Sequence, residues 1–195
     1  VVAVSLKKIA VEVGALTNVV VIDVDAHIGE NAKINQKADL NLDSRSSVYV
    51  LAGHDFFHVG VVASIAVSGE AAAAPSFDAT VYVVDVKSKI ADGAKVKAAK
   101  DVIVNANAES LFVSVAAGGS GAGMVGAGGS VGIVTMVTNT VASIGDDDGD
   151  TIGATVTTNG NVFVNAYDKA NVVLVTGAIG IGVGGGGFGA SVGVL

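Results

Sequence analysis

Short runs of β-branched and other apolar residues, separated by glycine, asparagine, aspartate and serine, recur along most of the chain. Eight such runs are Val48–Leu51, Val59–Val67, Val81–Val86, Val102–Val104, Leu111–Val115, Val131–Val137, Val162–Val164 and Val172–Val175. Runs of this kind, bounded by turn-forming residues, predict short β-strands. Ala71–Ala74 and Val96–Lys100 each predict one turn of helix at most. The pattern therefore predicts an all-β fold.

The chain also repeats itself with a period near sixty residues. Asp101–Ala106 recurs sixty positions later as Asn161–Ala166, and Asp39–Ser44 is a weaker copy that precedes Asp101 by 62 positions. Gly128–Val134 recurs 61 positions later as Gly189–Leu195. Self-similarity at a regular period is the signature of repeat architectures. Because strands follow one another without helices between them, the long repeat favours a solenoid over a sandwich or a barrel.

We therefore predict a right-handed parallel β-helix, or β-solenoid, that extends over residues 1–195 as a single unit. Each repeat of about sixty residues is expected to form about three rungs of roughly twenty residues, with parallel strands stacked about 4.8 Å apart. The approximate repeats are 1–27 (partial), 28–89, 90–143 and 144–195 (partial). Val104 and Val164 are predicted to occupy equivalent inward positions in neighbouring repeats.

A finer spacing places two insertions. Apolar residues lie six positions apart in two of the repeats, namely Ile28, Ile34 and Leu40 in one, and Ile90, Val96 and Val102 in the next. In the following repeat Ile144 precedes Val156 by twelve positions, so we assign about six extra residues to Asp146–Thr151. Ser68–Ala79, which contains the only proline, is interpreted as an insertion in the first repeat. Insertions in repeats usually form outward loops, and both segments are predicted to project from the stack.

Composition supports a stack and limits the partners. The chain is 51% hydrophobic but only 5% aromatic, so its core is expected to consist of thin Val, Ile and Ala side chains. The absence of cysteine excludes disulfides and thiol catalysis. The net charge of -7 argues against binding to nucleic acids or anionic membranes. The first residues, Val-Val-Ala-Val-Ser, include no initiator Met and no charged leader, which is the pattern expected of an excised or processed fragment.

The order of these motifs resembles a known family of repeats. Gly128–Val134, Thr138–Gly145 and Asn161–Ala166, with second copies near Ile90–Ala106 and Gly187–Leu195, look like the repeats of very large fusobacterial leukotoxins. They are also similar to filamentous, haemagglutinin-like adhesins of anaerobes that have an outer membrane. The resemblance is good over residues 80–195 and loose over 1–79. It implies a secreted or surface-exposed β-helix passenger of the autotransporter type, and it brings no catalytic motif.

Two groups of residues could carry metal chemistry. Asp146, Asp147, Asp148 and Asp150 crowd four carboxylates into one turn, which makes them a weak candidate for Ca²⁺. They lack the spacing of an EF-hand loop, and a solvated acidic turn is the default interpretation. His54 and His58 would lie about 13 Å apart on a strand, too far to share a metal. We expect these histidines to face water while Phe56 and Phe57 pack, and we expect no cofactor.

The glycine tracts Gly118–Gly129 and Gly177–Gly189 have two alternative explanations besides packing. Gly180–Gly184 resembles a nucleotide-binding loop, but no helix with a lysine or acidic partner follows it. Asn171–Leu195 lacks charges and is long enough to span a membrane, yet its apolar residues alternate with period two, which argues against insertion as a helix. A tightly packed face, where glycine allows close backbone approach, explains the tracts better.

These observations predict a structural or adhesive shaft segment of a very large protein that is secreted or held at the bacterial outer surface, and not an enzyme. Host-cell surfaces or extracellular matrix are the expected partners. One alternative is a membrane-active cytotoxin segment. Another is a subunit of a self-assembling filament, because open β-edges can associate end to end.

Overall fold

The computed structural model describes residues 1–6, 8–36, 45–145 and 152–195, and over these residues it is built from β-strands without a helix. The strands are β1 (Val2–Ser5), β2 (Ile9–Val11), β3 (Gly14–Ile28), β4 (Lys33–Ile34), β5 (Val48–Ser68), β6 (Ala71–Ile90), β7 (Lys95–Ala98), β8 (Val102–Ala122), β9 (Val125–Ile144), β10 (Thr155–Thr158), β11 (Val162–Gly182) and β12 (Gly186–Val194). The predicted all-β class is confirmed. The two segments with weak helical pattern, Ala71–Ala74 and Val96–Lys100, contribute to strands β6 and β7 instead.

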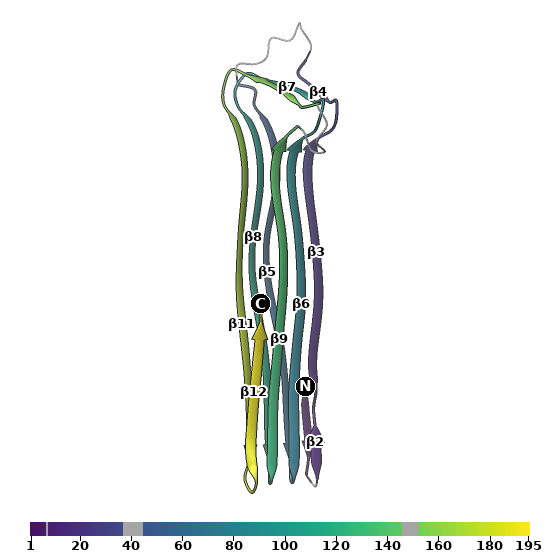
Figure 1. The fold of residues 1–195 in the computed structure, drawn as a ribbon, viewed down its shortest axis with the longest axis vertical. Helices are drawn as coiled ribbons and strands as arrows, with labels where there is room; N and C mark the ends of the chain where they lie inside the picture. Colours follow the sequence, from purple (N-terminus) through teal and green to yellow (C-terminus); the bar gives the residue numbers. More distant parts are fainter. Residues whose placement is uncertain (7, 37–44, 146–151) are drawn as a thin grey trace.

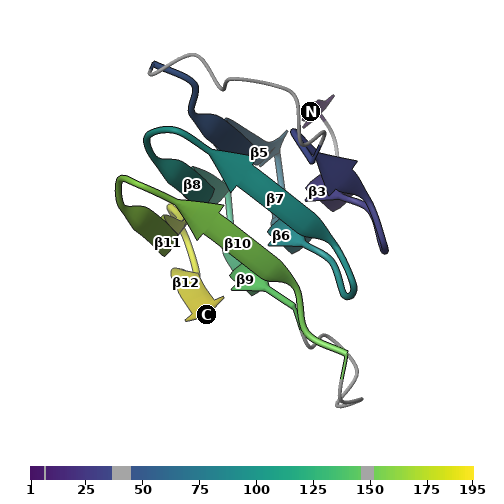
Figure 2. The ribbon, with the colours of Figure 1, turned by 90° about the horizontal axis from the view of Figure 1, so that it is seen from above.

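Among the described residues every strand pair is parallel, and the described strands form three sheets. The β8 sheet has the order β1-β5-β8-β11, and the β9 sheet has the order β12-β9-β6-β2, with β3 also paired to β6. A short sheet of β10, β7 and β4 lies across one end of the molecule (Figures 1 and 2). At the opposite end, which we call the turn end, tight turns connect β5 to β6, β8 to β9 and β11 to β12 (Figure 1). The two long sheets pack face to face.

Strand neighbours within a sheet lie one whole repeat apart in the sequence. Val102 pairs with Val48, 54 positions earlier, and with Val162, 60 positions later. One passage through β8, β9 and the short strand β10 therefore brings the chain back beside its starting strand. The prediction of three stacked rungs of roughly twenty residues per repeat is wrong for the described strands. The twenty-residue pieces are long strands of two facing sheets, because their inward and outward residues alternate along the whole strand without a corner.

The pairing register relocates the first insertion. Ile34 pairs with Val96 at a separation of 62 positions, whereas Val48 pairs with Val102 at 54, so the eight extra residues lie between Ile34 and Val48. The interpretation of Ser68–Ala79 as an outward loop is wrong. Most of this segment belongs to β6, which pairs with β9 and buries every second side chain. The weak motif at Asp39–Ser44, which suggested the other alignment, lies outside the described residues.

The second insertion lies where the spacing of apolar residues in the sequence predicts it. Ile90 pairs with Ile144 at a separation of 54 positions, and Val96 pairs with Val156 at 60. Six extra residues therefore lie between Ile144 and Val156, as predicted. The segment to which we assigned them, Asp146–Thr151, lies outside the described residues.

The interior narrows from one end of the long sheets to the other. Near the short sheet it is filled by large side chains such as Ile90, Val96 and Val104, and midway by Tyr82 and Phe112. At the turn end the inward side chains are alanines, serines and glycines, among them the buried cluster Ala10, Ala66, Ala72, Ala74 and Ala122. The inward side chains are thus smallest at the turn end, where the two sheets come into close contact.

Glycine permits the closest approach at the turn end. A Cβ atom on Gly118 would lie closer than 3.0 Å to the carbonyl oxygens of Gly129 and Ala74 in the facing sheet, a separation that real Cβ atoms do not show. A Cβ atom on Gly128 would meet the carbonyl oxygen of Ile179 in the same way. The two sheets are therefore in backbone contact here. This confirms close backbone approach as the explanation of the inward glycines of the tracts, whereas the outward Gly119, Gly121 and Gly177 face open space.

Replacing Gly118 by alanine is therefore expected to lower the free energy of unfolding by about 3 kcal/mol, because the methyl group forces the sheets apart. Gly119→Ala is the matched control, since a Cβ atom on the outward Gly119 meets nothing within 4 Å. Urea denaturation followed by circular dichroism measures both changes. Equal destabilisation by the two variants would contradict the backbone contact.

Val104 and Val164 pair directly, so their equivalence is confirmed, but their burial differs. Val104 is 0% exposed, whereas Val164 is 48% exposed because β11 is the outermost described strand of its sheet. The inward position of Val164 is covered on one side only.

Val104→Asp is expected to cost about 4 kcal/mol or more, because it encloses an unpaired carboxylate between the sheets. Val164→Asp is expected to cost about 1 kcal/mol, since the carboxylate at that edge can reach water. Thermal melting of both variants tests the difference, and similar melting temperatures would show that the edge strand is covered in solution.

Candidate functional site

A cluster of polar and aromatic side chains lies between the two long sheets, midway along the strands. Tyr82 on β6 is fully buried and crosses the interior to the β8 sheet. Its hydroxyl lies 2.6 Å from Nε2 of His54 on β5 and 3.1 Å from Oγ of Ser110 on β8. One phenol therefore ties a strand of one sheet to two strands of the other.

Aromatic rings surround this hydrogen-bonded group. The ring centroids of Phe56 and Tyr82 are 5.0 Å apart, and those of His58 and Phe112 are 4.4 Å apart. His54, Phe56 and His58 alternate with exposed residues on β5 and share its inward face, while Phe57 is 63% exposed on the outside. The expectation that the histidines face water and that Phe57 packs is wrong, because the strand's two-residue period puts the odd-numbered residues outside.

A buried carboxylate lies next to the aromatic rings. Asp78 on β6 is fully buried and accepts hydrogen bonds from the Ser114 hydroxyl and from Thr80 Oγ1, the latter at 3.4 Å. Nε2 of His58 is also buried and has no hydrogen-bond partner. Enclosing a carboxylate is costly unless donors surround it, so these hydroxyls compensate for its burial. The side chains of Asp78, Tyr82 and Ser114 are closed to solvent, and their arrangement joins the sheets without offering them to a substrate.

Burial shifts the pKa values of two groups in the cluster, His54 and Tyr82. It lowers the pKa of His54, and the neighbouring Asp55 opposes this shift in part. It also raises the pKa of Tyr82, while the hydrogen bond with Ser110 lowers that pKa and Asp168 raises it further. Near neutral pH we therefore infer that His54 is neutral and accepts a hydrogen bond from the protonated Tyr82 hydroxyl. The Tyr82 oxygen is then free to accept a hydrogen bond from Ser110.

The structure does not bring the three histidines together, because His54 and His58 share the inward face of β5 with Phe56 between them. His27 lies on β3, where its Nδ1 is 3.2 Å from a carboxylate oxygen of Asp25. Among the described residues, no group of three or more histidines and carboxylates could hold a metal ion. The weak calcium candidate, Asp146, Asp147, Asp148 and Asp150, lies outside the described residues and stays a prediction.

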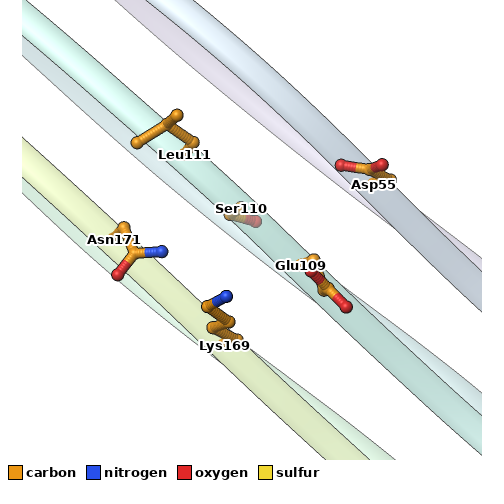
Figure 3. Close-up of a pocket in the computed structure, with 6 residues that line it drawn as sticks. All are labelled: Asp55, Glu109, Ser110, Leu111, Lys169 and Asn171. Atoms are coloured by element: carbon orange, nitrogen blue, oxygen red, sulfur yellow. The ribbon is translucent and has the colours of Figure 1, made fainter.

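A small hollow marks the outer face of the β8 sheet (Figure 3). Asp55, Glu109 and Lys169 form one row across β5, β8 and β11, and the next row includes Leu111 and Asn171. These residues, with Ser110 behind them, line a cavity of about 200 Å³. Sequence reasoning missed this row because its members lie 54 and 60 positions apart, and only the pairing register aligns them.

Comparison with known proteins finds no matching family model, no similar curated protein and no matching solved structure. Over the part of the chain that the structure describes, no helix is long and apolar enough to cross a membrane. The resemblance to leukotoxin and adhesin repeats therefore stays a prediction from the sequence.

The lowered pKa of His54 predicts that the fold loses stability in mild acid. Because the folded pKa lies below about 6.5, the ordinary value, the unfolded chain binds more protons between the two pKa values. Stability is therefore expected to fall as the pH drops below about 6.5 and to level off below the folded pKa. His54→Gln should flatten this part of a profile of unfolding midpoint against pH. His27→Gln, on the outer face, is the matched control, and a profile that His54→Gln leaves unchanged would contradict the assignment.

Proposed function

We propose that the chain is a segment of a right-handed parallel β-solenoid that forms a structural and adhesive shaft in a very large secreted or cell-surface bacterial protein. The observation that carries the proposal is the register, in which each repeat of about sixty residues lies in parallel on the repeat before it. Right-handedness is the strong preference for connections between parallel strands of one sheet.

Equivalent side chains from successive repeats form columns, which supports indefinite stacking. Across the β8 sheet, one such column consists of Val50, Val104 and Val164, and another consists of Ala52, Ala106 and Ala166. On the outer face Asn165 Nδ2 donates a hydrogen bond to Asn105 Oδ1 at 2.8 Å. The surface that each repeat offers to the next one therefore resembles the surface on which it is itself stacked, as in other repeat proteins.

The outermost described strands offer edges on which another repeat could form. β11, β12 and β10 each lie at one side of their sheet. Val162, Phe163 and Val164 on β11 are about half exposed because no further strand covers them. Such edges favour either continuation of the same chain or end-to-end association of separate chains. Both outcomes lengthen a shaft.

The proposed shaft acts through its length and its outer faces, and it includes no catalytic centre and no cofactor. Its proposed partners are host-cell surfaces or extracellular matrix. The net charge of -7 argues against nucleic acids as partners.

Adding a repeat tests the stacking directly. Leu195 follows Val194, which pairs with Ile133, so a second copy of residues 135–195 fused after Leu195 continues the register. We expect this longer chain to unfold at a higher urea concentration and with a steeper dependence on urea, because the new strands bury the edge of β11. The matched control carries proline at the positions of Val164 and Val172 in the added copy, where it breaks the strand ladder.

An added copy that unfolds separately, or that leaves the urea midpoint at the control value, would overturn the solenoid proposal. The same proteins should release no dye from loaded liposomes, since a shaft does not permeabilise membranes. Dye release by the parent chain would favour the membrane-active alternative.

A further inference from the structure

The outer face of the β8 sheet mixes polar and apolar side chains towards the short sheet and is apolar towards the turn end, and a single charged row separates the two parts. The division is the row of Asp55, Glu109 and Lys169 (Figure 3). From that row to the turn end, Asn171 is the one polar outward residue of these three strands, and the outward positions of 57–67, 111–121 and 173–181 contain only valine, isoleucine, leucine, phenylalanine, alanine and glycine. We call this surface the apolar zone. Several of its side chains are largely exposed, including Val61 at 63% and Ile179 at 65%.

The apolar zone has a ridge and a hollow that run across the strands. The row of Ala63, Ala117 and Gly177 leaves a depression, and with neighbouring residues it lines an apolar cavity of about 330 Å³. Four positions along the strands, the row of Val59, Val113 and Val173 forms a ridge. The row that contains Val115 lies midway between ridge and hollow.

This spacing makes the apolar zone complementary to itself. A twofold axis that lies between the two molecules at the level of Val115, parallel to the sheets and perpendicular to the strands, would place the ridge of each molecule in the hollow of the other. The strands of the two molecules would then run antiparallel. A twofold interface uses the same patch on both partners, which a single face with a matched ridge and hollow satisfies.

The charge distribution favours the same orientation. The antiparallel arrangement places the charged row of Asp55, Glu109 and Lys169 at the rim of the contact, because only the turn-end parts of the two faces overlap. In a parallel arrangement this row would lie inside the contact. Charged groups are costly to remove from water, so their position at the rim favours the antiparallel arrangement.

The size of the apolar zone suits a second molecule. Three strands about 4.8 Å apart and ten residue steps of about 3.3 Å give roughly 500 Å² per molecule, or about 1,000 Å² for the pair. That area lies at the low end for specific interfaces, and each further repeat would add about 170 Å² per molecule. The hydrocarbon of a lipid bilayer is a less favourable partner for the apolar zone than a second molecule. In a bilayer the unpaired backbone groups along the edge of β11 would lose their hydrogen bonds to water.

We propose that two molecules of this chain associate face to face through the apolar zone, with antiparallel strands about a twofold axis at Val115. This lateral association is distinct from the stacking of repeats at strand edges, and it does not depend on the shaft function.

Sedimentation velocity of the full chain over a range of concentrations tests the association. We expect a dimer that forms with increasing concentration, and we expect Val115→Lys to weaken it at least tenfold. Val137→Lys is the matched control, because Val137 is an exposed outward valine of β9, in the other long sheet and outside the apolar zone. Its self-association should equal that of the parent. Circular dichroism verifies that each variant is folded.

A crosslinking experiment keeps the proposal testable if the lysine variant fails to fold. The chain contains no cysteine, so Val115→Cys introduces a single thiol close to its own symmetry mate. We expect a disulfide-linked dimer on mild oxidation, and little crosslinking of Val137→Cys. A monomer at all concentrations up to about 1 mM would overturn the proposal. So would a dimer that only the Val137 variants disrupt, or binding of the parent chain to neutral phosphatidylcholine vesicles that Val115→Lys abolishes.

Discussion

The backbones of the two long sheets approach each other at the turn end so closely that some inward positions leave no room for a Cβ atom. Gly118 and Gly128 occupy inward positions where added methyl groups would overlap carbonyl oxygens of the facing sheet. This approach requires small inward residues at the turn end, and the larger inward side chains lie further along the strands. The short sheet lies across the opposite end (Figure 1).

The buried polar cluster lies away from this close contact. Midway along the strands the gap is wide enough for aromatic rings, and Tyr82 reaches across it to His54 and Ser110. The fully buried Asp78 is compensated by hydroxyl donors from both sheets. Directional bonds of this kind disfavour a slip of one sheet along the other, because a slip would leave a carboxylate without donors. The cluster is thus well suited to hold the register on which the stacking of repeats depends.

The outer faces differ from the interior in where their large apolar side chains lie. Because the interior at the turn end is filled by alanine and glycine, the larger apolar side chains there point outward, as Val61 and Ile179 do. The strands thus carry most of their hydrophobic bulk on the outside over half of their length. An exposed apolar surface of this extent usually marks an interaction site, and it gives the proposed shaft a means of lateral association in addition to growth along its strand edges.

The sequence by itself determined the all-β class, the spacing of about sixty residues, the equivalence of Val104 and Val164 and the six extra residues between Ile144 and Val156. These are local or repetitive properties, and a repeated chain displays them without knowledge of its partners in space. Only the tertiary structure decided that a repeat forms two long strands and one short one instead of three equal rungs. It also placed the first insertion before Val48, turned His54 and His58 inward and left Val164 at an edge. Periodicity reveals which residues share a face, but whether that face meets another sheet or water depends on contacts between strands some sixty residues apart.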